Sequence, residues 1–569
     1  MKNIFLSSVK WLSNLKQSKW LKFDWVQSLW SKEKRDLLKL PSPADTDKAN
    51  IPKQNQAHAC PNYLDLKMRF RDVGRMNGII ESLGRDFLTA MPEGAYKSRL
   101  GQISFLARRL HEDLASQDIA DLIEQASAHQ KQNPDDWDRW DRANLFEMET
   151  MYRHHCKIDP DLMEQRANLS YEGRRFHRDV LKNNDWEKAQ PFLEEMIQTQ
   201  RDIAESKCLS DNHHATEAPY QALMREYMPG TRLDDVDALF SNMRKSVDDL
   251  LPKVLNKKKL DSSPLPLNGE FESPLQLWLN KSLLKVIGFD FERGGLYETG
   301  HNPVEGGTPD DTRLVIKTSD TSNFLESMKS ALHEGGHGLY IQGLPRKEWR
   351  YQPVGQDLGA AVQESQALLV EMVLGRTKEF FVYLSPRIEG LFQKFGDEAL
   401  SAENLYRLKT QVKPTIDRKN ADEITYFYHI DMRMRLERDM VSGKLAVKDL
   451  PDAWNAEIKK FTGKEPETHA RGCLQDVHWF VGKFGYFPSY TLGHMMAAQI
   501  KQRMEKDIQN IPELLSAGEF EPIQQWLGKN IHAKGRLLRP DALMNDLTGM
   551  ELSEKPLLDH LETRYLQAA

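Results

Sequence analysis

Apolar side chains recur at helical spacing along most of this chain from about residue 63 onward. Runs that could form strands are scarce, and the clearest is Arg313–Thr318. A chain with this pattern buries its apolar faces by packing helix on helix, and one strand-like region adds only a small sheet. We therefore predict a mostly α fold with one large helical domain. The helical spacing is seen at Leu66, Phe70 and Val73, and again at Val236, Leu239 and Met243.

Charge and cysteine content exclude several classes of protein. The 569 residues carry a formal net charge of -6, so the chain has no overall basic field and we expect no nucleic-acid partner. The four cysteines are too few for a disulfide scaffold, and they are typical of free thiols in a reducing compartment. No apolar run approaches the roughly 20 residues that span a bilayer. We expect a cytoplasmic protein.

The first 62 residues differ from the rest of the chain. Residues 1–23 contain five lysines and no acidic residue, together with Trp11 and Trp20, and residues 41–62 are polar with four prolines, as in a linker. A basic helix with tryptophans could rest on a membrane surface or serve as a transit segment. We favour the alternative, a helix packed on the main body or a frayed extension. The predicted domains are 1–62, an extension and linker, and 63–569, a helical catalytic domain.

The sequence His-Glu-Gly-Gly-His begins at His333. Positions four apart share one face of a helix, so His333 and His337 can reach the same cation. Glu334 then lies toward the side where an attacking water is held, and it can take the proton of that water and pass it to the leaving amine. Gly335 and Gly336 each cost about 1 kcal/mol in a helix interior, so we expect substrate or another backbone to approach closely here.

A catalytic zinc site needs a third protein ligand, and a carboxylate on a following helix is a common solution. Glu364 lies in the apolar helical run 361–370, where a glutamate is costly to bury unless it is paired or bound to a metal. We predict that His333, His337 and Glu364 hold one zinc ion per chain. Glu371, two turns further along the same face, is either a partner of a metal ligand or a solvated carboxylate.

Further motifs accompany these residues. They are MPEGA at 91–95, GCLQ at 472–475, QDVHW at 475–479 and FGYFPSY at 484–490. Together with the histidine motif and Glu364-Ser365-Gln366, they resemble the M32 family of metallocarboxypeptidases, the Taq carboxypeptidase type, over roughly residues 63–569. The resemblance implies a helical peptidase with a long deep groove, a homodimer, and the release of single residues from peptides with a free C-terminus. It also implies zinc, for which cobalt or another divalent metal may substitute.

The resemblance also implies roles for residues outside the metal site. A tetrahedral oxyanion needs a donor besides the metal, and His478, Tyr486 and Tyr490 are the catalytic candidates that the motifs supply. For any single one of these rings, a position in the core is the alternative.

An exopeptidase must also recognise a terminal carboxylate, which the planar guanidinium of arginine pairs with bidentately. Arg418 holds the arginine position of the family motif I-R-x-x-A-D, and Arg313 is the second candidate. Gln475, the glutamine of the family motif G-x-x-Q, is the third residue expected to bind substrate.

The chain departs from the family pattern at several positions. Asp417 replaces the isoleucine before Arg418, Val315 stands where D-x-R-x-T has threonine, and Arg85 replaces a tryptophan. The family's His-Pro-Phe is only echoed by residues 301–303, His-Asn-Pro. Asp417 could engage the Arg418 guanidinium or repel the substrate terminus. These departures concern specificity more than chemistry.

Two other functions remain open at this point. A zinc oligopeptide endopeptidase or dipeptidase would keep the metal site but lose the capture of a terminal carboxylate. A binding protein descended from a peptidase would have lost activity along with its motifs. The intact Glu334 argues against a pure binding protein, which has no need of a general base.

Overall fold

The computed structural model describes residues 60–210, 218–258, 263–298, 307–318 and 320–567. The chain divides into two units, Met1–Ala59 and Cys60–Ala569, and the description concerns the second. The basic extension and most of the linker lie outside the described residues, as does the segment 301–303. No helix among the described residues is both long and apolar enough to cross a membrane.

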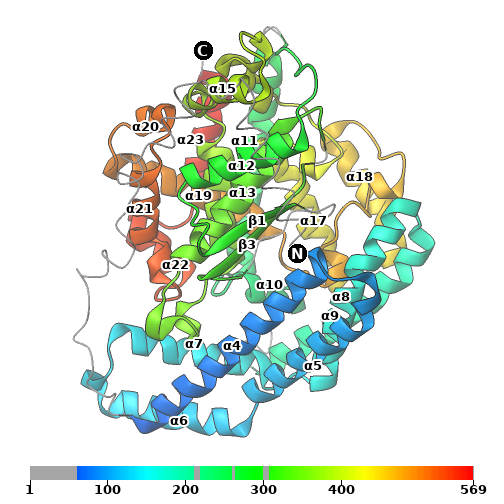
Figure 1. Ribbon diagram of the computed structural model, residues 1–569. Helices are drawn as coiled ribbons and strands as arrows, with labels where there is room; N and C mark the ends of the chain where they lie inside the picture. The colour runs from blue at the N-terminus through cyan, green and yellow to red at the C-terminus, as the bar shows by residue number, and fades with distance from the viewer. Residues whose placement is uncertain (1–59, 211–217, 259–262, 299–306, 319, 568–569) are drawn as a thin grey trace. The chain divides into compact units, whose positions relative to one another are not determined.

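The helices between residues 61 and 210 form one group, coloured blue to turquoise in Figure 1. Helix α4 begins at Pro61, where a proline without an N–H fits the first helical turn. Its apolar face, formed by Tyr63, Leu66, Phe70 and Val73, is buried in a cluster with residues of α5, α6 and α7, which confirms the helical spacing read from the sequence. The helices of this region are α4 (Pro61–Thr89), α5 (Tyr96–Leu114), α6 (Gln117–Gln132), α7 (Arg139–His155), α8 (Pro160–Asn183) and α9 (Trp186–Ser210).

A three-stranded sheet follows α10 (Pro219–Tyr227), α11 (Leu233–Lys258) and α12 (Ser273–Val286). Its strands are β1 (Gly294–Glu298), β2 (Gly307–Thr308) and β3 (Asp311–Ile316). The central strand β3 pairs in parallel with β1 and antiparallel with β2. The predicted strand at 313–318 thus begins two residues earlier, because Asp311 and Thr312 pair with β2.

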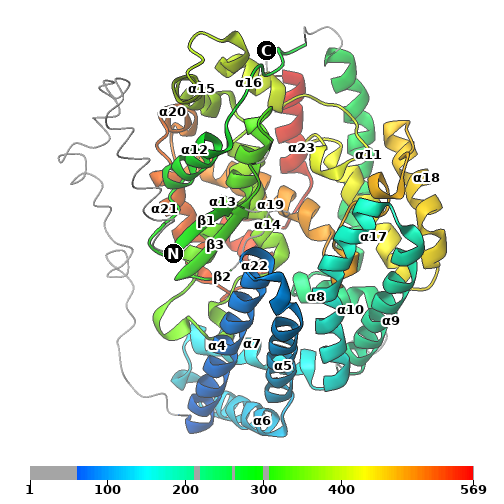
Figure 2. The ribbon, with the colours of Figure 1, turned by 45° about the vertical axis from the view of Figure 1, so that its right-hand side comes forward.

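Three neighbouring helices carry the histidine motif, the segment Glu364-Ser365-Gln366 and the last three residues of the motif at 484–490. Helix α13 (Phe324–Gly343) lies against β3 and α12, and Figure 2 shows it next to the sheet. Helix α14 (Ala360–Leu368) contacts both α13 and α19 (Pro488–Asp507). The side chain of Asn323 accepts a hydrogen bond from the backbone N–H of Leu325 and caps the start of α13. Helix α14 continues into a π-helical stretch, η6 (Leu369–Leu374).

The other described helices surround this group and share one large apolar core with it. The prediction of a mostly helical protein with a small sheet is confirmed. These helices are α15 (Lys378–Phe392), α16 (Ala402–Lys409), α17 (Tyr426–Val441), α18 (Leu450–Thr462), α20 (Ile511–Ala517), α21 (Glu521–Asn530), α22 (Pro540–Thr548) and α23 (Lys555–Glu562).

Candidate metal centre

The side chains of His333, His337 and Glu364 converge. Their ligand atoms all lie within 4.8 Å of one another, and no second such group is found in the part of the chain that the structure describes. Oε2 of Glu364 is 3.7 Å from Nε2 of His333 and 3.9 Å from Nε2 of His337. Glu364 and His337 are buried, and His333 is half-buried. The structure therefore brings together the three residues that the sequence singled out.

Two glycines let the helices that carry these residues come close. A Cβ atom at Gly336 of α13 would lie 2.4 Å from the carbonyl oxygen of Gln366 and 2.6 Å from Cα of Ala367 in α14. A Cβ atom at Gly493 of α19 would lie 2.7 Å from Cβ of Glu364. Helix α14 is thus held between two helices at contact distance, and this is the close backbone approach expected at Gly336.

Both histidines are oriented through their other ring nitrogen. Nδ1 of His333 lies 3.0 Å from Oε2 of Glu371, and Nδ1 of His337 lies 3.1 Å from Oε1 of Gln363. Because both partners are acceptors, each Nδ1 carries a proton, and Nε2 is the ring nitrogen left to bind a metal. Glu371 is only 5% exposed, so the alternative of a solvated carboxylate is wrong.

The donor set fits a divalent metal ion. Two imidazole nitrogens and one carboxylate oxygen form a common catalytic zinc set, with bonds of about 2.0–2.2 Å and a position left for water. Two donors on such an ion lie no more than about 4.4 Å apart, and both distances from Glu364 fall within that limit. Oε2 of Glu364 is also buried without a hydrogen-bond partner, which is costly unless a cation takes its lone pair.

The surrounding carboxylates change the charge of His333. Burial disfavours its charged form, but the hydrogen bond to Glu371 and the charges of Glu364, Glu371 and Glu334 outweigh burial and raise the pKa of His333 to about 10. Burial also opposes ionisation of Glu371, yet Arg376 and His333 hold the pKa of Glu371 well below its usual range. Since only neutral imidazole ligates a metal, metal binding must displace the proton from His333.

Glu334 lies on α13 between the two histidines. Its side chain is 4% exposed, and its charge contributes to the raised pKa of His333. A carboxylate that is close to a metal ligand and shielded from bulk solvent is well placed to exchange a proton with a water molecule held there.

Aromatic residues from the segment before and at the start of α19 line the site. The hydroxyl of Tyr486 donates to Oε1 of Glu364 at 3.0 Å. The hydroxyl of Tyr490 lies 3.1 Å from Nε2 of His478, and the rings of Tyr486 and Tyr490 are 5.4 Å apart. Tyr486 thus contacts a candidate metal ligand, and the pair His478 and Tyr490 lies next to Tyr486.

The pair His478 and Tyr490 carries no charge at neutral pH. Burial and the nearby Arg418 lower the pKa of His478 well below its usual value. Burial raises the pKa of Tyr490 well above its usual value. A neutral imidazole next to a protonated phenol can support hydrogen-bond donation to a developing oxyanion.

Arg418 lies beside this pair and is held by Asp476. Nε of Arg418 donates to Oδ1 of Asp476 at 2.9 Å, and its guanidinium is 5.3 Å from the ring centre of Tyr490. Arg433, which is fully buried, donates from Nε to Oδ2 of the same carboxylate at 2.6 Å. Two guanidinium groups share one carboxylate, so a net positive charge remains next to Tyr490.

Asp417 and Gln475 hold the loop of Arg418. The carboxylate of Asp417 accepts from the backbone N–H of Lys419 at 3.1 Å and from Nδ2 of Asn420 at 2.9 Å. The guanidinium of Arg418 pairs with Asp476 instead, so the idea that Asp417 engages it is wrong. Oε1 of Gln475 accepts from the backbone N–H of Arg418 at 3.1 Å, and its Nε2 donates to three backbone carbonyls. The side chain of Gln475 is therefore engaged by the protein itself.

The structure keeps Arg313 apart from these residues. Arg313 is exposed on β3 and pairs with Asp311 at 2.7 and 3.1 Å. Its guanidinium lies 5.8 Å from the ring centre of Tyr297 in β1. These described contacts place Arg313 on the exposed face of the sheet rather than beside Tyr490.

Sequence reasoning missed three residues of the site. Asp476 holds Arg418, Arg376 donates to Oε1 of Glu371 at 2.5 Å, and the hydroxyl of Tyr426 lies 3.5 Å from Nη1 of Arg418. Asp476 belongs to the motif QDVHW at 475–479, which is the signal that could have found it, whereas Arg376 is followed by Thr377, Lys378 and Glu379 and does not stand out in the sequence. No signal in the sequence distinguished Tyr426 from a core tyrosine.

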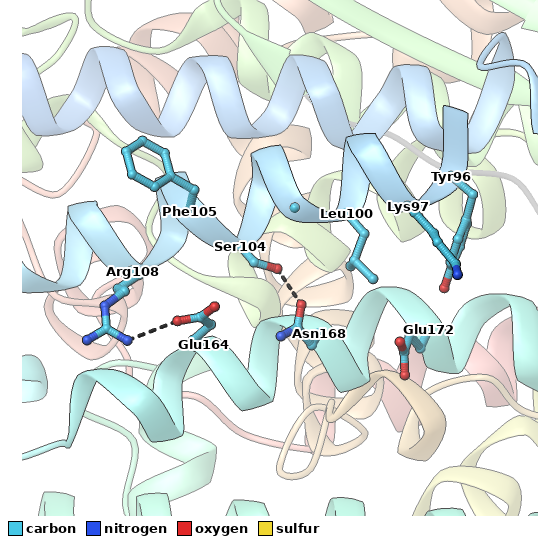
Figure 3. A pocket seen from close by; sticks show the side chains of 10 residues that line it. Tyr96, Lys97, Leu100, Ser104, Phe105, Arg108, Glu164, Asn168 and Glu172 are labelled. Atoms are coloured by element: carbon cyan, nitrogen blue, oxygen red, sulfur yellow. Dashed lines mark hydrogen bonds and ion pairs between the residues drawn. The ribbon is translucent and has the colours of Figure 1, made fainter. Parts of the chain in front are cut away.

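A surface pocket away from the metal centre contains none of the candidate catalytic residues. It has a volume of about 480 Å³ and lies between α5 and α8. Figure 3 shows two polar pairs across it, Ser104 with Asn168, which are 2.5 Å apart, and Arg108 with Glu164, which are 2.9 Å apart.

Known proteins share both the sequence pattern and this fold. The model of the Carboxypeptidase Taq (M32) metallopeptidase family matches residues 65–565. Thermostable carboxypeptidase 1 of Thermus thermophilus is 32% identical over 507 residues, which are 86% of this chain and 96% of that protein. Carboxypeptidase 1 of Bacillus subtilis is 32% identical over 416 residues, 73% of this chain and 81% of that protein.

Solved structures agree. Trypanosoma cruzi metallocarboxypeptidase 1 matches with a TM-score of 0.83 at 30% identity, over 89% of this chain and 100% of that one. A structure of Pyrococcus furiosus carboxypeptidase matches with a TM-score of 0.81 at 26% identity, over 90% and 100%. Family match, relatives and fold together show that this chain belongs to the M32 family of metallocarboxypeptidases and is a peptide hydrolase.

Proposed function

We propose that this protein is a zinc-dependent carboxypeptidase that releases single residues from the C-terminus of peptides. The convergence of His333, His337 and Glu364 around one point carries the proposal. These three residues are the metal ligands, and two imidazoles with one carboxylate suit zinc.

The residues around the ligands have separate tasks. When bound, the zinc ion supplies Lewis acidity, which polarises the scissile carbonyl and makes water a better nucleophile. The carboxylate of Glu334 takes the proton of the attacking water and delivers it to the leaving nitrogen. The hydroxyl of Tyr490, paired with His478, donates to the oxyanion. Tyr486 holds the carboxylate of Glu364 in place.

Arg418 binds the terminal carboxylate of the peptide. Its charge is shared with Arg433 over the single carboxylate of Asp476, so an incoming carboxylate meets a net positive charge. The guanidinium lies 5.3 Å from the Tyr490 ring centre, so a carboxylate bound to it would lie near the residue proposed to donate to the oxyanion. Gln475 and Asp417 position this arginine.

The test compares one peptide as free acid and as C-terminal amide. Zinc-loaded enzyme should release single residues from the acid, identified by mass spectrometry, and should cut the amide poorly. Chelation should abolish turnover and added zinc should restore it. Equal cleavage of both forms at internal bonds would instead support the endopeptidase alternative. The homodimer and the cytoplasmic location remain predictions, and light scattering of the purified chain tests the first.

A further inference from the structure

The helix that carries Glu364 changes its winding immediately after it. Helix α14 passes into the π-helical stretch η6 at Leu369, and Glu371 lies within that stretch. Wider turns of this kind are rare and are found frequently at functional sites. The Glu371 side chain is 6% exposed, and a carboxylate so deeply buried is costly unless its oxygens are paired.

Both oxygens of Glu371 are paired. Oε2 lies 3.0 Å from Nδ1 of His333, and Oε1 accepts from Nη2 of Arg376 at 2.5 Å. The first contact turns Nε2 of His333 toward Glu364, from which it is 3.7 Å away. The second contact holds the other oxygen of the carboxylate.

A residue of the C-terminal segment holds the backbone around Glu371. Nη1 of Arg564 donates to the carbonyl oxygen of Met372 at 2.8 Å, and Nη2 donates to that of Val373 at 3.0 Å. Nη1 also donates to Oε2 of Glu423 at 2.8 Å. One guanidinium therefore bridges two carbonyls of η6 and a buried carboxylate.

Glu423 gathers further contacts from the same segment. It accepts from Nε2 of His560 at 3.0 Å and from the hydroxyl of Tyr565 at 2.9 Å, and its side chain has no exposed surface. The segment 555–567 is thus tied by charged hydrogen bonds to the stretch that carries Glu371.

We propose that Glu371 is a positioning residue for His333 and sets the affinity for the metal, and that Arg564 holds η6 in the conformation that keeps Glu371 in place. The proposal rests on the assignment of His333 as a metal ligand. Partners of this kind fix the ring orientation and the tautomer of a ligand histidine, and their loss typically weakens metal binding about 10- to 100-fold.

Glu371→Gln is the direct test, because an amide cannot replace the carboxylate. If its oxygen accepts from His333, its NH2 faces the Arg376 guanidinium, which has no acceptor to offer. If its oxygen accepts from Arg376, its NH2 faces Nδ1 of His333 and favours the wrong tautomer. Either way one contact is lost while size and shape are kept.

The matched control is Asp431→Asn. Glu371 is paired with a histidine and an arginine, and Asp431 is a buried carboxylate paired with two arginines, Arg244 and Arg435. No described contact joins Asp431 to the metal residues. Both substitutions should lower the thermal stability of the metal-free protein. Only a positioning role predicts that they differ in metal affinity.

The experiment measures zinc affinity of the full chain by competition with a chromophoric chelator. Glu371→Gln should bind zinc about 10- to 100-fold more weakly than wild type, and Asp431→Asn within about twofold of it. Arg564→Lys keeps a charge near Glu423 but lacks the planar fork that reaches two carbonyls and a carboxylate together, so it should weaken zinc binding by a smaller factor. Absorption of the cobalt-loaded protein should change in Glu371→Gln and not in Asp431→Asn.

The outcomes separate the inference from the proposed function. Wild-type affinity and an unchanged cobalt spectrum in Glu371→Gln would overturn the inference while leaving the zinc peptidase intact. Unchanged zinc affinity in a folded Arg564→Lys variant would overturn the role proposed for Arg564. A wild-type chain without zinc affinity or zinc-dependent turnover would overturn both.

Discussion

The hydroxyl of Tyr486 donates a hydrogen bond of 3.0 Å to Oε1 of Glu364, while Oε2 of the same carboxylate faces the two histidines. The two oxygens of Glu364 therefore have different tasks, one toward the metal position and one toward the protein. Hydrogen bonds of this kind orient a ligand carboxylate and tune its affinity for the metal.

Tyr486→Phe should therefore act mainly on metal binding. Zinc affinity should fall about tenfold or more because Glu364 loses its orienting partner, as measured by chelator competition. Tyr490→Phe should instead lower kcat with zinc affinity unchanged, because its hydroxyl serves the oxyanion. If Tyr486→Phe loses kcat at unchanged zinc affinity, Tyr486 is a transition-state donor, as the sequence resemblance implied.

Glu334→Gln should bind zinc like wild type and lose turnover by at least about 100-fold. The amide cannot accept the proton of the attacking water, while none of the three ligands is altered. Turnover of a peptide acid and zinc content are measured on the same preparation. A variant with full zinc content and a near-normal rate would show that another group is the base.

Arg418→Ala should lower kcat/KM for free peptide acids about 10- to 100-fold, because a charge-assisted bidentate contact contributes about 1.5–3 kcal/mol. The amide form of the same peptide should be affected little. Arg313→Ala is the matched control and should change neither, since Arg313 is exposed and paired with Asp311. A larger loss in Arg313→Ala than in Arg418→Ala would reverse the assignment.

Gly336→Ala should force α13 and α14 apart. The new methyl group would meet backbone atoms of Gln366 and Ala367, which cannot rotate away, and overpacking of this kind costs about 1–3 kcal/mol. The midpoint temperature of thermal unfolding and the affinity for zinc should both fall. Gly390→Ala in α15 is the control, because a Cβ there meets nothing within 4 Å. That substitution should leave zinc binding unchanged and stabilise the protein slightly.

Glu437 should make the stability of the protein depend on pH. Burial raises the pKa of Glu437 from 4.5 to about 8, although Tyr220, Trp479 and Gly485 donate to it. Because the pKa of Glu437 is higher in the folded state, the protonated carboxyl group favours the folded protein. This contribution to the free energy of unfolding is complete below pH 4.5 and is lost as pH rises toward 8.

Urea unfolding of wild type and Glu437→Gln at several pH values tests this. The free energy of unfolding of wild type, relative to the variant, should fall by about 2–5 kcal/mol between pH 5 and pH 8.5. Parallel curves would show that Glu437 is ionised throughout.

The sequence was informative where a local pattern has a direct structural meaning. The spacing of His333 and His337 places both on one helical face, and Glu364 stood out as an acid within an apolar run. The helical domain followed from periodicity alone. The strand before α13 was found but shifted by two residues, because pairing with the two-residue β2 leaves no signal in the sequence.

Contacts between distant residues were not available from the sequence. Asp476 lies 58 residues from Arg418, and its ion pair with that arginine depends on how two loops meet. Gln475 was expected to bind substrate, but its side-chain amide donates hydrogen bonds to backbone carbonyls of the protein. The status of Glu371 was left open for the same reason, since its partner His333 lies 38 residues away in the sequence. Its other partner, Arg376, is only five residues away but is reached through the winding of η6.

The position of α14 between Gly336 and Gly493 bears on how the metal can leave and return. A helix gripped at backbone distance on both sides has little room to shift, so Glu364 gains few new conformations when the ion is removed. Ligands that are already in place lose little conformational entropy on rebinding. Stripping the metal should thus be a reversible event that leaves the architecture standing, unlike in small zinc domains, whose folding depends on the ion.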